Sequence, residues 1–278
     1  MATRVGFVGL GRIGRPMAFN IVNAGFDLMV FDVREEALKD FEHCGAKLAR
    51  FPKEVGSHGE IIELAVVDDA QVEEVVLGRG GLLEGARPGS IIAIHSTISL
   101  KTVKEVARLA EENGVGILDA QVSGGEMGAQ QRQLCYLVGG EREALEKCRP
   151  VFEASGANIF HMGTLGSGAT AKAILQVVVC INMLAVGEAE YLCEKGGVDF
   201  TALQEALRVS SGQSFVLDHW LERFKRPNDP MSVRQKRTDI FCKSLFPALE
   251  LARDLDLSLP GAALALERLS WIMGVERK

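Results

Sequence analysis

The chain has 278 residues, of which 47% are hydrophobic and 24% are charged, and its formal net charge is −6. This composition is typical of a soluble globular protein with a substantial core, and the length suits one large or two medium domains. The negative charge disfavours nucleic acids and anionic membranes as general partners, because the long-range field repels them.

Targeting and metal-binding patterns are also missing from the sequence. Arg4 is followed directly by a strand-like run with glycines, and not by the long apolar core of a secretion signal. The apolar stretch 173–186 is short for a membrane span and contains two polar amides, Gln176 and Asn182. Six cysteines are scattered without CxxC spacing, which is typical of free thiols. We therefore expect a cytoplasmic protein without a membrane contact, a metal site or disulfides.

Strand-like apolar runs alternate with helical spacing over the first half of the chain. The strand-like runs cover residues 5–8, 27–31, 61–66, 91–94, 116–118, 134–138 and 158–160. Helical spacing covers residues 12–24, 69–77, 100–113 and 141–152. This alternation predicts an N-terminal α/β domain of the Rossmann type, a doubly wound and mainly parallel sheet with helices on both faces.

The pattern changes at the glycine-rich segment 163–168. From there on no strand-like run occurs, and apolar residues recur every three or four positions, which predicts an all-α C-terminal domain. Residues 169–195 predict one long interdomain helix, ended by Gly196 and Gly197. We expect two domains, residues 1–163 and residues 164–278.

Three glycines stand between the first strand and the first helix. Gly9 permits a tight turn, Gly11 lets the backbone approach a pyrophosphate, and Gly14 lets the helix pack close to the strand. The helix N-terminus adds free N–H groups and a positive partial charge. The second strand then ends at Asp32, where a carboxylate accepts hydrogen bonds from ribose hydroxyls. Strand, glycines, helix, strand and acid in this order predict a dinucleotide-binding domain.

The acidic residue also bears on the choice of dinucleotide. A carboxylate at Asp32 repels the 2′-phosphate of NADP and favours NAD, whereas Arg34 moderates that repulsion and permits some use of NADP. The predicted contacts of the first turn are Gly9, Leu10, Gly11, Arg12, Ile13 and Gly14.

Polar residues follow two later strands, at the edge of the sheet where ligands bind. His95-Ser96-Thr97 follows one strand, and Asp119-Ala120-Gln121 follows the next, so we expect both segments to face the ligand cleft. His95 is either a proton carrier or a structural hydrogen-bond partner. Ser123 and the two glycines after it offer a hydroxyl and free N–H groups to a small carboxylate, although a flexible turn explains the same residues.

One lysine lies in an otherwise apolar helical stretch. Lys172 is followed one turn later by Gln176, so the two side chains share a helix face. Such a lysine is either an edge residue whose ammonium reaches solvent or a buried functional amine. A role as a base requires burial or a cationic neighbour, since either one lowers the pKa of an amine.

Three segments resemble the signatures of the β-hydroxyacid dehydrogenase family, which includes 3-hydroxyisobutyrate dehydrogenases and tartronate semialdehyde reductases. The segments are GFVGLGRIGRPMAFNIVNAG, DAQVSGGEMGAQQRQLCYLVGG and GSGATAKAILQ, and the resemblance covers nearly the whole chain. It implies an NAD(P)-dependent oxidoreductase that transfers a hydride between the nicotinamide and a small anionic β-hydroxy acid or its semialdehyde. By this resemblance Lys172 is the general acid/base, and Ser123, Gly124 and Gly125 hold the substrate carboxylate.

The resemblance also implies contacts with the cofactor. Thr97 matches the threonine beside the nicotinamide, and Lys243 aligns with a lysine that closes over the cofactor. Val67 stands at a cofactor position where the family has proline, and Ser244 replaces the aspartate that follows the closing lysine.

Two further departures concern the substrate. Gln176 replaces the family's asparagine, which keeps the amide but moves it outward by one methylene. Arg132 replaces a glycine, and its guanidinium either anchors a substrate anion or reaches solvent. We expect both residues to influence the choice of substrate.

Two other functions remain open at this point. One is an imine reductase on the same scaffold, and the other is a non-catalytic nucleotide-sensing protein. The presence of Lys172 and of the loop at Ser123 favours a hydroxyacid dehydrogenase over both. The long apolar helix predicts burial against a partner subunit, and the family resemblance implies a homodimer or a homotetramer.

Overall fold

The computed structural model describes residues 2–275, and the chain divides into two compact units, Met1–Lys172 and Ala173–Lys278. The predicted domain boundary between residues 163 and 164 stays a prediction. Within the described residues of the first unit, eight strands form one sheet in the order β3-β2-β1-β4-β5-β6-β7-β8. The strands are β1 (Arg4–Val8), β2 (Asp27–Phe31), β3 (Lys47–Leu48), β4 (Ile61–Leu64), β5 (Ile91–Ile94), β6 (Gly116–Ser123), β7 (Leu134–Gly139) and β8 (Gly156–Gly163).

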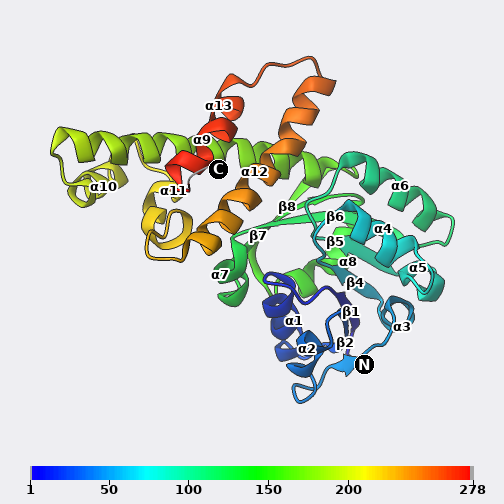
Figure 1. Ribbon diagram of the computed structural model, residues 1–278. Helices are drawn as coiled ribbons and strands as arrows, with labels where there is room; N and C mark the ends of the chain where they lie inside the picture. Colours follow the sequence, from blue (N-terminus) through cyan, green and yellow to red (C-terminus); the bar gives the residue numbers. More distant parts are fainter. Residues whose placement is uncertain (1, 276–278) are drawn as a thin grey trace. The chain divides into compact units, whose positions relative to one another are not determined.

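Helices cover both faces of this sheet (Figure 1). They are α1 (Gly14–Asn23), α2 (Glu35–Lys39), α3 (Pro52–His58), α4 (Asp69–Leu77), α5 (Leu82–Gly85), α6 (Leu100–Glu111), α7 (Gly125–Gln130) and α8 (Arg142–Phe152). Each face has its own apolar core. Phe7, Met17 and Tyr136 lie in one core, and Ile62 and Val76 lie in the other. The predicted doubly wound α/β domain is confirmed.

The sheet departs from the parallel pattern where β6 pairs with β7. These two strands run antiparallel, with Ser123 opposite Cys135, whereas the other described pairs are parallel. The short connection explains the reversal, because it holds only the small helix α7, and a parallel crossover needs about a dozen residues or more. As a result, β6 continues to Ser123, and Asp119 and Gln121 lie inside this strand instead of after its end.

The second unit is helical among its described residues, as predicted. Its helices are α10 (Phe200–Arg208), α11 (Phe215–Asp218), the π-helical turn η1 (Trp220–Phe224), α12 (Met231–Asp254) and α13 (Pro260–Ile272). Helix α9 (Ser167–Gly196) begins in the first unit and continues into the second. It ends before Gly197, whose φ of +70° suits the left-handed conformation that closes a helix. Pro260 takes the first position of α13, where its missing N–H removes no hydrogen bond from the helix.

Helix α9 is long and apolar enough to cross a membrane, by length and composition. The expectation that this stretch is too short for a span is therefore wrong, since the helix has 30 residues. Cys180, Met183 and Leu184 of this helix are buried in the core of the second unit, and 33% of its most apolar stretch is buried in all.

Candidate active site

The turn between β1 and α1 requires two of its glycines for packing and leaves the third open. Gly9 has a φ of +95°, and a Cβ atom there would lie 2.3 Å from the carbonyl oxygen of Ala65. A Cβ on Gly14 would lie 2.0 Å from the carbonyl oxygen of Gly9. A Cβ on Gly11, by contrast, would meet nothing within 4 Å. Packing therefore explains Gly9 and Gly14, and the open surface at Gly11 fits the close approach of a dinucleotide.

The start of α1 is equally suited to an anion. Ile13 takes the N-cap position without a capping side chain, and the first turn contains no acidic residue. The first N–H groups of the helix therefore keep their positive partial charge for a phosphate group. The residues present fit a bound dinucleotide.

Asp32 is buried behind this turn and holds it in place. Its Oδ2 accepts a hydrogen bond from the Leu10 N–H at 2.7 Å, and its Oδ1 accepts from the Arg34 N–H at 2.9 Å and from Arg34 Nε at 3.0 Å. Burial alone would raise the pKa of Asp32, but the hydrogen bonds from Arg34 and Leu10 outweigh it and lower the pKa. The carboxylate therefore stays ionised. It holds the glycine turn through the Leu10 N–H and fixes the position of the Arg34 side chain.

The turn after β6 has a backbone that only glycine adopts readily. Gly124 has a φ of +127° and Gly125 a φ of +63°, directly after Ser123 at the end of the strand. A Cβ on Gly125 would meet nothing within 4 Å. Helix α7 is anchored to α1, since Asn20 Nδ2 donates a hydrogen bond to the Ala129 carbonyl at 2.7 Å. These contacts favour a fixed turn over a flexible one.

Lys172 reaches the same strand from the beginning of α9. Its Nζ donates a hydrogen bond to the carbonyl of Val122 at 2.9 Å, one residue before Ser123. The side chain is partly buried. Burial raises the pKa of the Cys135 thiol on β7, and the positive charge of Lys172 offsets only part of this rise. The Lys172 amine therefore lies beside the end of β6, where the Ser123 turn begins.

Asp119 holds the beginning of α9 against β6. Its Oδ1 accepts a hydrogen bond from the Gly166 N–H and its Oδ2 accepts from the Ala169 N–H, both at 2.8 Å. Burial raises the pKa of this carboxyl, although the backbone N–H groups favour the ionised form. The position of Lys172, one turn further along α9, therefore depends on a side chain from β6.

Comparison with known proteins agrees with this geometry. Residues 4–163 match the NAD-binding domain of 6-phosphogluconate dehydrogenase, and residues 166–273 match the NAD-binding domain of NADP-dependent 3-hydroxyisobutyrate dehydrogenase. The chain belongs to the 3-hydroxyisobutyrate dehydrogenase family. The resemblance to β-hydroxyacid dehydrogenases is thereby confirmed, and with it an NAD(P)-dependent oxidoreductase.

Individual relatives extend over most of the chain. An NAD-dependent L-serine dehydrogenase of Pseudomonas aeruginosa is 37% identical over 77% of this chain and 72% of its own length. A 2-hydroxy-3-oxopropionate reductase of Escherichia coli is 35% identical over 95% of this chain and 89% of its own. The structure of a Mycobacterium tuberculosis 3-hydroxyisobutyrate dehydrogenase with L-serine has a TM-score of 0.83 and 27% identity, and it covers 99% of this chain and 94% of that one.

Most residues of the two segments that were predicted to face the cleft are instead part of the interior. Asp119 serves α9, as described above, so its predicted place facing the ligand is wrong. His95 is also buried, where its Nε2 lies 2.6 Å from Glu63 Oε2 and its Nδ1 lies 2.7 Å from the carbonyl of Ala120. These contacts agree with the structural alternative for His95. Glu63 was not predicted as the partner of His95, although a charged residue within the apolar run of β4 is a signal for such a buried pair.

The remaining predicted contacts lie in different places. Val67 and Thr97 are exposed just after β4 and β5, at the carboxyl edge of the sheet. Gln176 is buried on α9, one turn after Lys172, and Lys243 lies on α12 in the second unit. Their contacts with cofactor or substrate stay predictions.

Arg132 is exposed to solvent and also contacts α1. Its Nε lies 3.4 Å from Asn20 Oδ1 on α1, and its φ is +59°. The guanidinium is thus directed at least partly toward the helix that begins at the glycine turn.

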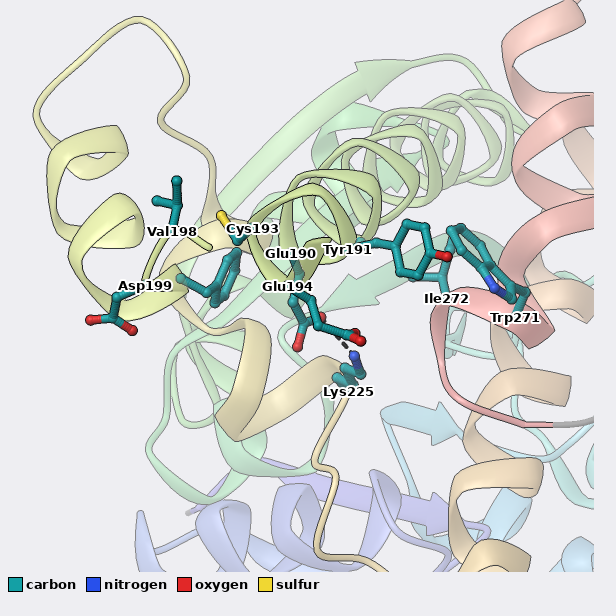
Figure 2. Close-up of a pocket in the computed structure, with 11 residues that line it drawn as sticks. Glu190, Tyr191, Cys193, Glu194, Val198, Asp199, Lys225, Trp271 and Ile272 are labelled. Carbon is teal, nitrogen blue, oxygen red and sulfur yellow. Dashed lines mark hydrogen bonds and ion pairs between the residues drawn. The ribbon is translucent and has the colours of Figure 1, made fainter. Parts of the chain in front are cut away.

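The second unit contains a separate hollow of about 360 Å³ (Figure 2). Glu190 lies in its wall and accepts hydrogen bonds from Lys225 Nζ at 2.7 Å and from Trp220 Nε1 at 2.8 Å. Tyr191 and Trp271 meet edge to face beside it. None of the predicted site residues lines this hollow.

Proposed function

We propose that the protein interconverts a small β-hydroxy acid and its semialdehyde, with Lys172 as the general acid/base. The hydrogen bond between Lys172 Nζ and the Val122 carbonyl carries this proposal, because it holds the amine beside the Ser123 turn. L-Serine, 3-hydroxyisobutyrate and 2-hydroxy-3-oxopropionate, which appear in the names of the relatives, share one carboxylate and an oxygen on the third carbon. We infer a substrate of this class.

The chain's own residues divide the work between binding and proton transfer. Ser123 and the N–H groups of Gly124 and Gly125 bind the substrate carboxylate, and the amide of Gln176 hydrogen-bonds the reacting oxygen or that carboxylate. In oxidation neutral Lys172 takes the hydroxyl proton at Nζ, and in reduction its ammonium returns a proton to the developing alkoxide. When bound, the nicotinamide accepts or returns the hydride. Arg132 contacts Asn20, which favours a structural role for it over a substrate contact.

We propose NAD as the preferred cofactor, with some use of NADP. The open surface at Gly11, the backbone of residues 9–14 and the start of α1 bind the pyrophosphate. Asp32 supports NAD because it stays ionised, whereas the Arg34 guanidinium beside it is about half exposed and available to a 2′-phosphate. Val67, Thr97 and Lys243 complete the predicted set of cofactor contacts.

Two alternatives lead to different measurements. An imine reductase needs hydride delivery but no carboxylate-binding turn, and a nucleotide-sensing protein needs no general acid/base at all. The fixed Ser123–Gly125 backbone and the placement of Lys172 beside it favour the hydroxyacid dehydrogenase.

The decisive experiment follows NADH or NADPH absorbance with a panel of hydroxy acids of three to five carbons, including L-serine and 3-hydroxyisobutyrate. Thermal shifts with each acid in the presence of NAD identify binding that does not lead to turnover. We expect turnover with at least one acid and a higher kcat/KM with NAD than with NADP. Reduction of cyclic imines without oxidation of any acid contradicts the proposal, as does cofactor binding without any turnover.

We further propose a cytoplasmic homo-oligomer, a dimer or a tetramer, formed through the second unit. Tyr191, Leu192 and Trp271 are large hydrophobic residues of that unit, and each exposes between 45% and 70% of its surface. An exposed group of this kind is typical of an interface. The six cysteines are scattered without CxxC spacing, which supports a reducing compartment. Light scattering coupled to size exclusion measures the mass, and a monomer at micromolar concentration contradicts this proposal.

A further inference from the structure

A buried glutamine joins the ends of two strands at the carboxyl edge of the sheet. Gln121 lies on β6 with no exposed surface, and its Nε2 donates hydrogen bonds to the Ser96 carbonyl at 2.9 Å and to the Ile94 carbonyl at 3.3 Å. Both acceptors belong to the last residues of β5 and the turn after it. One amide group therefore determines how the end of β5 lies against β6.

Only the nitrogen of the Gln121 amide makes hydrogen bonds among the described residues. Backbone carbonyls only accept hydrogen bonds, so the nitrogen of Gln121 must face them. Its Oε1 is buried and has no hydrogen-bond partner among the described residues. A buried acceptor without a partner lowers stability, and an apolar side chain of similar size would avoid that cost. The glutamine is thus poorly explained by stability and better explained by what its Nε2 holds.

The contacts continue on both sides of Gln121. Ser96, whose carbonyl it binds, accepts a hydrogen bond at Oγ from the Val66 N–H at 2.9 Å, which ties in the end of β4. Thr97 follows Ser96 and is exposed. On the other side, Val122 follows Gln121, and its carbonyl accepts the hydrogen bond from Lys172. Gln121 is therefore a direct link between the Thr97 turn and the strand segment that receives the lysine.

The topology indicates which part of a dinucleotide lies here. In a doubly wound sheet the first strands bind one mononucleotide half, and the strands beyond the crossover bind the other. The glycine turn and Asp32 belong to β1 and β2, which leaves the ends of β4, β5 and β6 for the nicotinamide half.

We propose that Gln121 is a positioning residue, which fixes the Thr97 turn against β6 and so sets the nicotinamide half of the cofactor relative to Lys172. This rests on the proposed function for the identity of the cofactor and of the proton carrier. Gln121 acts through the backbone of Ser96 and Thr97 and need not touch the reacting atoms.

Calorimetry with NAD and with ADP-ribose, which lacks the nicotinamide, tests this assignment. For Gln121→Met, which keeps the size and removes the donor, we expect the Kd for NAD to rise about tenfold, as for the loss of one to two net hydrogen bonds. The Kd for ADP-ribose should stay within about twofold, because it depends on the glycine turn. Unchanged ADP-ribose binding also shows that the variant is folded.

A matched control is available in the second unit. Gln204 on α10 is also buried, and its Nε2 donates a hydrogen bond to the carbonyl of Leu217. Gln204→Met removes the same kind of interaction far along the chain, and we expect it to leave the ratio of the two Kd values unchanged.

A second variant adds a readout that a general loss of packing does not produce. Gln121→Glu keeps the shape, and the introduced carboxyl donates a hydrogen bond only while it is protonated. We expect NAD affinity to recover toward the wild-type value as the pH is lowered from about 8 to about 5, where a buried carboxyl holds its proton. Gln121→Met should show no such recovery.

The proposal is overturned if Gln121→Met weakens NAD and ADP-ribose equally, or if it weakens neither. It is also overturned if Gln204→Met alters the ratio of the two Kd values as strongly. Failure of the proposed function looks different, since wild-type protein would then bind NAD but oxidise no hydroxy acid. The ratio of the two Kd values still reports on Gln121 in that case.

Discussion

The glycine turn and the Ser123–Lys172 region lie on the same unit but are built in opposite ways. The glycine turn is assembled within the first strand–helix–strand segment of the chain, since residues 9–14, Asp32 and Arg34 contact one another directly. The Ser123–Lys172 region is assembled from distant segments, where Lys172 contacts Val122 and Asp119 contacts Gly166 and Ala169. Sequence motifs therefore predict the first region as a whole. For the second region they predict the separate segments but not how these segments come together.

The two regions also differ in what their conformation depends on. In the glycine turn the absence of side chains is essential, because a Cβ on Gly9 or Gly14 would overlap backbone atoms. Around Lys172 the presence of polar side chains is essential, because Asp119 and Gln121 bind backbone groups of other elements. Substitutions in the glycine turn should therefore weaken binding of the whole dinucleotide, whereas substitutions around Lys172 should alter catalytic geometry and the placement of the nicotinamide half.

The largest expected effect separates the chemistry of the two regions. Lys172→Ala removes the proposed proton carrier, and turnover should fall by about 10²- to 10⁴-fold, as is usual for general acid/base groups. The Kd for NAD should stay within about twofold, because the glycine turn is unchanged. Steady-state kinetics with the best acid and calorimetry with NAD measure the two quantities.

Lys147→Ala is the control for this substitution. Lys147 is an exposed lysine on α8 that pairs with Glu143, and its loss should leave turnover unchanged. Near-normal turnover of Lys172→Ala would sink its assignment as the general acid/base.

Asp32 tests the other region. For Asp32→Ala we expect the preference for NAD over NADP, measured as a ratio of kcat/KM, to fall by about tenfold or more, since a charged hydrogen-bond partner is worth about 1.5–3 kcal/mol. Asp32→Asn removes the charge while its oxygen still accepts from the Leu10 N–H. This variant therefore separates repulsion of the 2′-phosphate from closure of the turn. An unchanged preference in both variants would count against the role of Asp32.

His95 and Glu63 form a buried pair between the end of β5 and β4. This pair should make the stability of the protein depend on pH. Burial alone would lower the pKa of His95, but the charge and hydrogen bond of Glu63 outweigh it and raise the pKa above the value of the unfolded chain. The resulting stability is fully present below the unfolded pKa of about 6.5 and is lost as the pH rises through the folded value.

Urea unfolding across a range of pH measures this effect. We expect the free energy of unfolding of the wild type to fall as the pH rises above neutrality. Glu63→Gln should flatten this dependence, because it removes the charge that raises the pKa of His95. An equally steep dependence in Glu63→Gln would show that another group is responsible.

The smallest expected effect concerns Arg132, which follows the Ser123 turn in sequence and contacts Asn20 on α1. Its φ of +59° is unfavourable for a residue with a side chain, so Arg132→Gly should raise the free energy of unfolding by about 0.5–1 kcal/mol. The KM for the acid should stay within about twofold. A tenfold rise in KM would instead restore Arg132 as a substrate anchor.

Periodicity and glycine placement were enough to predict most of the fold. The strands at 27–31 and 91–94 and the helix at 69–77 have the predicted bounds, because each is a regular apolar pattern bounded by polar or turn residues. Helices α2, α3, α5 and α7 and the short strand β3 were missed. Their stability comes from packing against neighbouring elements, and two glycines in α7 weaken any local helical signal.

Sequence motifs identified several residues of the candidate site but not the contacts that hold the site together. Lys172, the Ser123 turn and Asp32 follow from motifs, whereas the placement of Asp119 and Gln121 within β6 does not. Both residues seemed to follow a strand because the sequence signal ends at residue 118. The antiparallel partner β7 extends β6 to Ser123 and buries them. Strand pairing of this kind depends on residues far away in sequence, which no local pattern contains.

The sequence by itself therefore determined the α/β and all-α halves, the dinucleotide turn and the lysine to examine, because glycine conformation and apolar periodicity are local properties. Only the tertiary structure decided that Asp32 closes the glycine turn, that Asp119 holds α9, and that Gln121 joins β5 to β6. The physical reason is that a buried polar group must find its partner wherever the fold supplies one. For Asp119 and Gln121 those partners lie about 25 to 50 positions away along the chain.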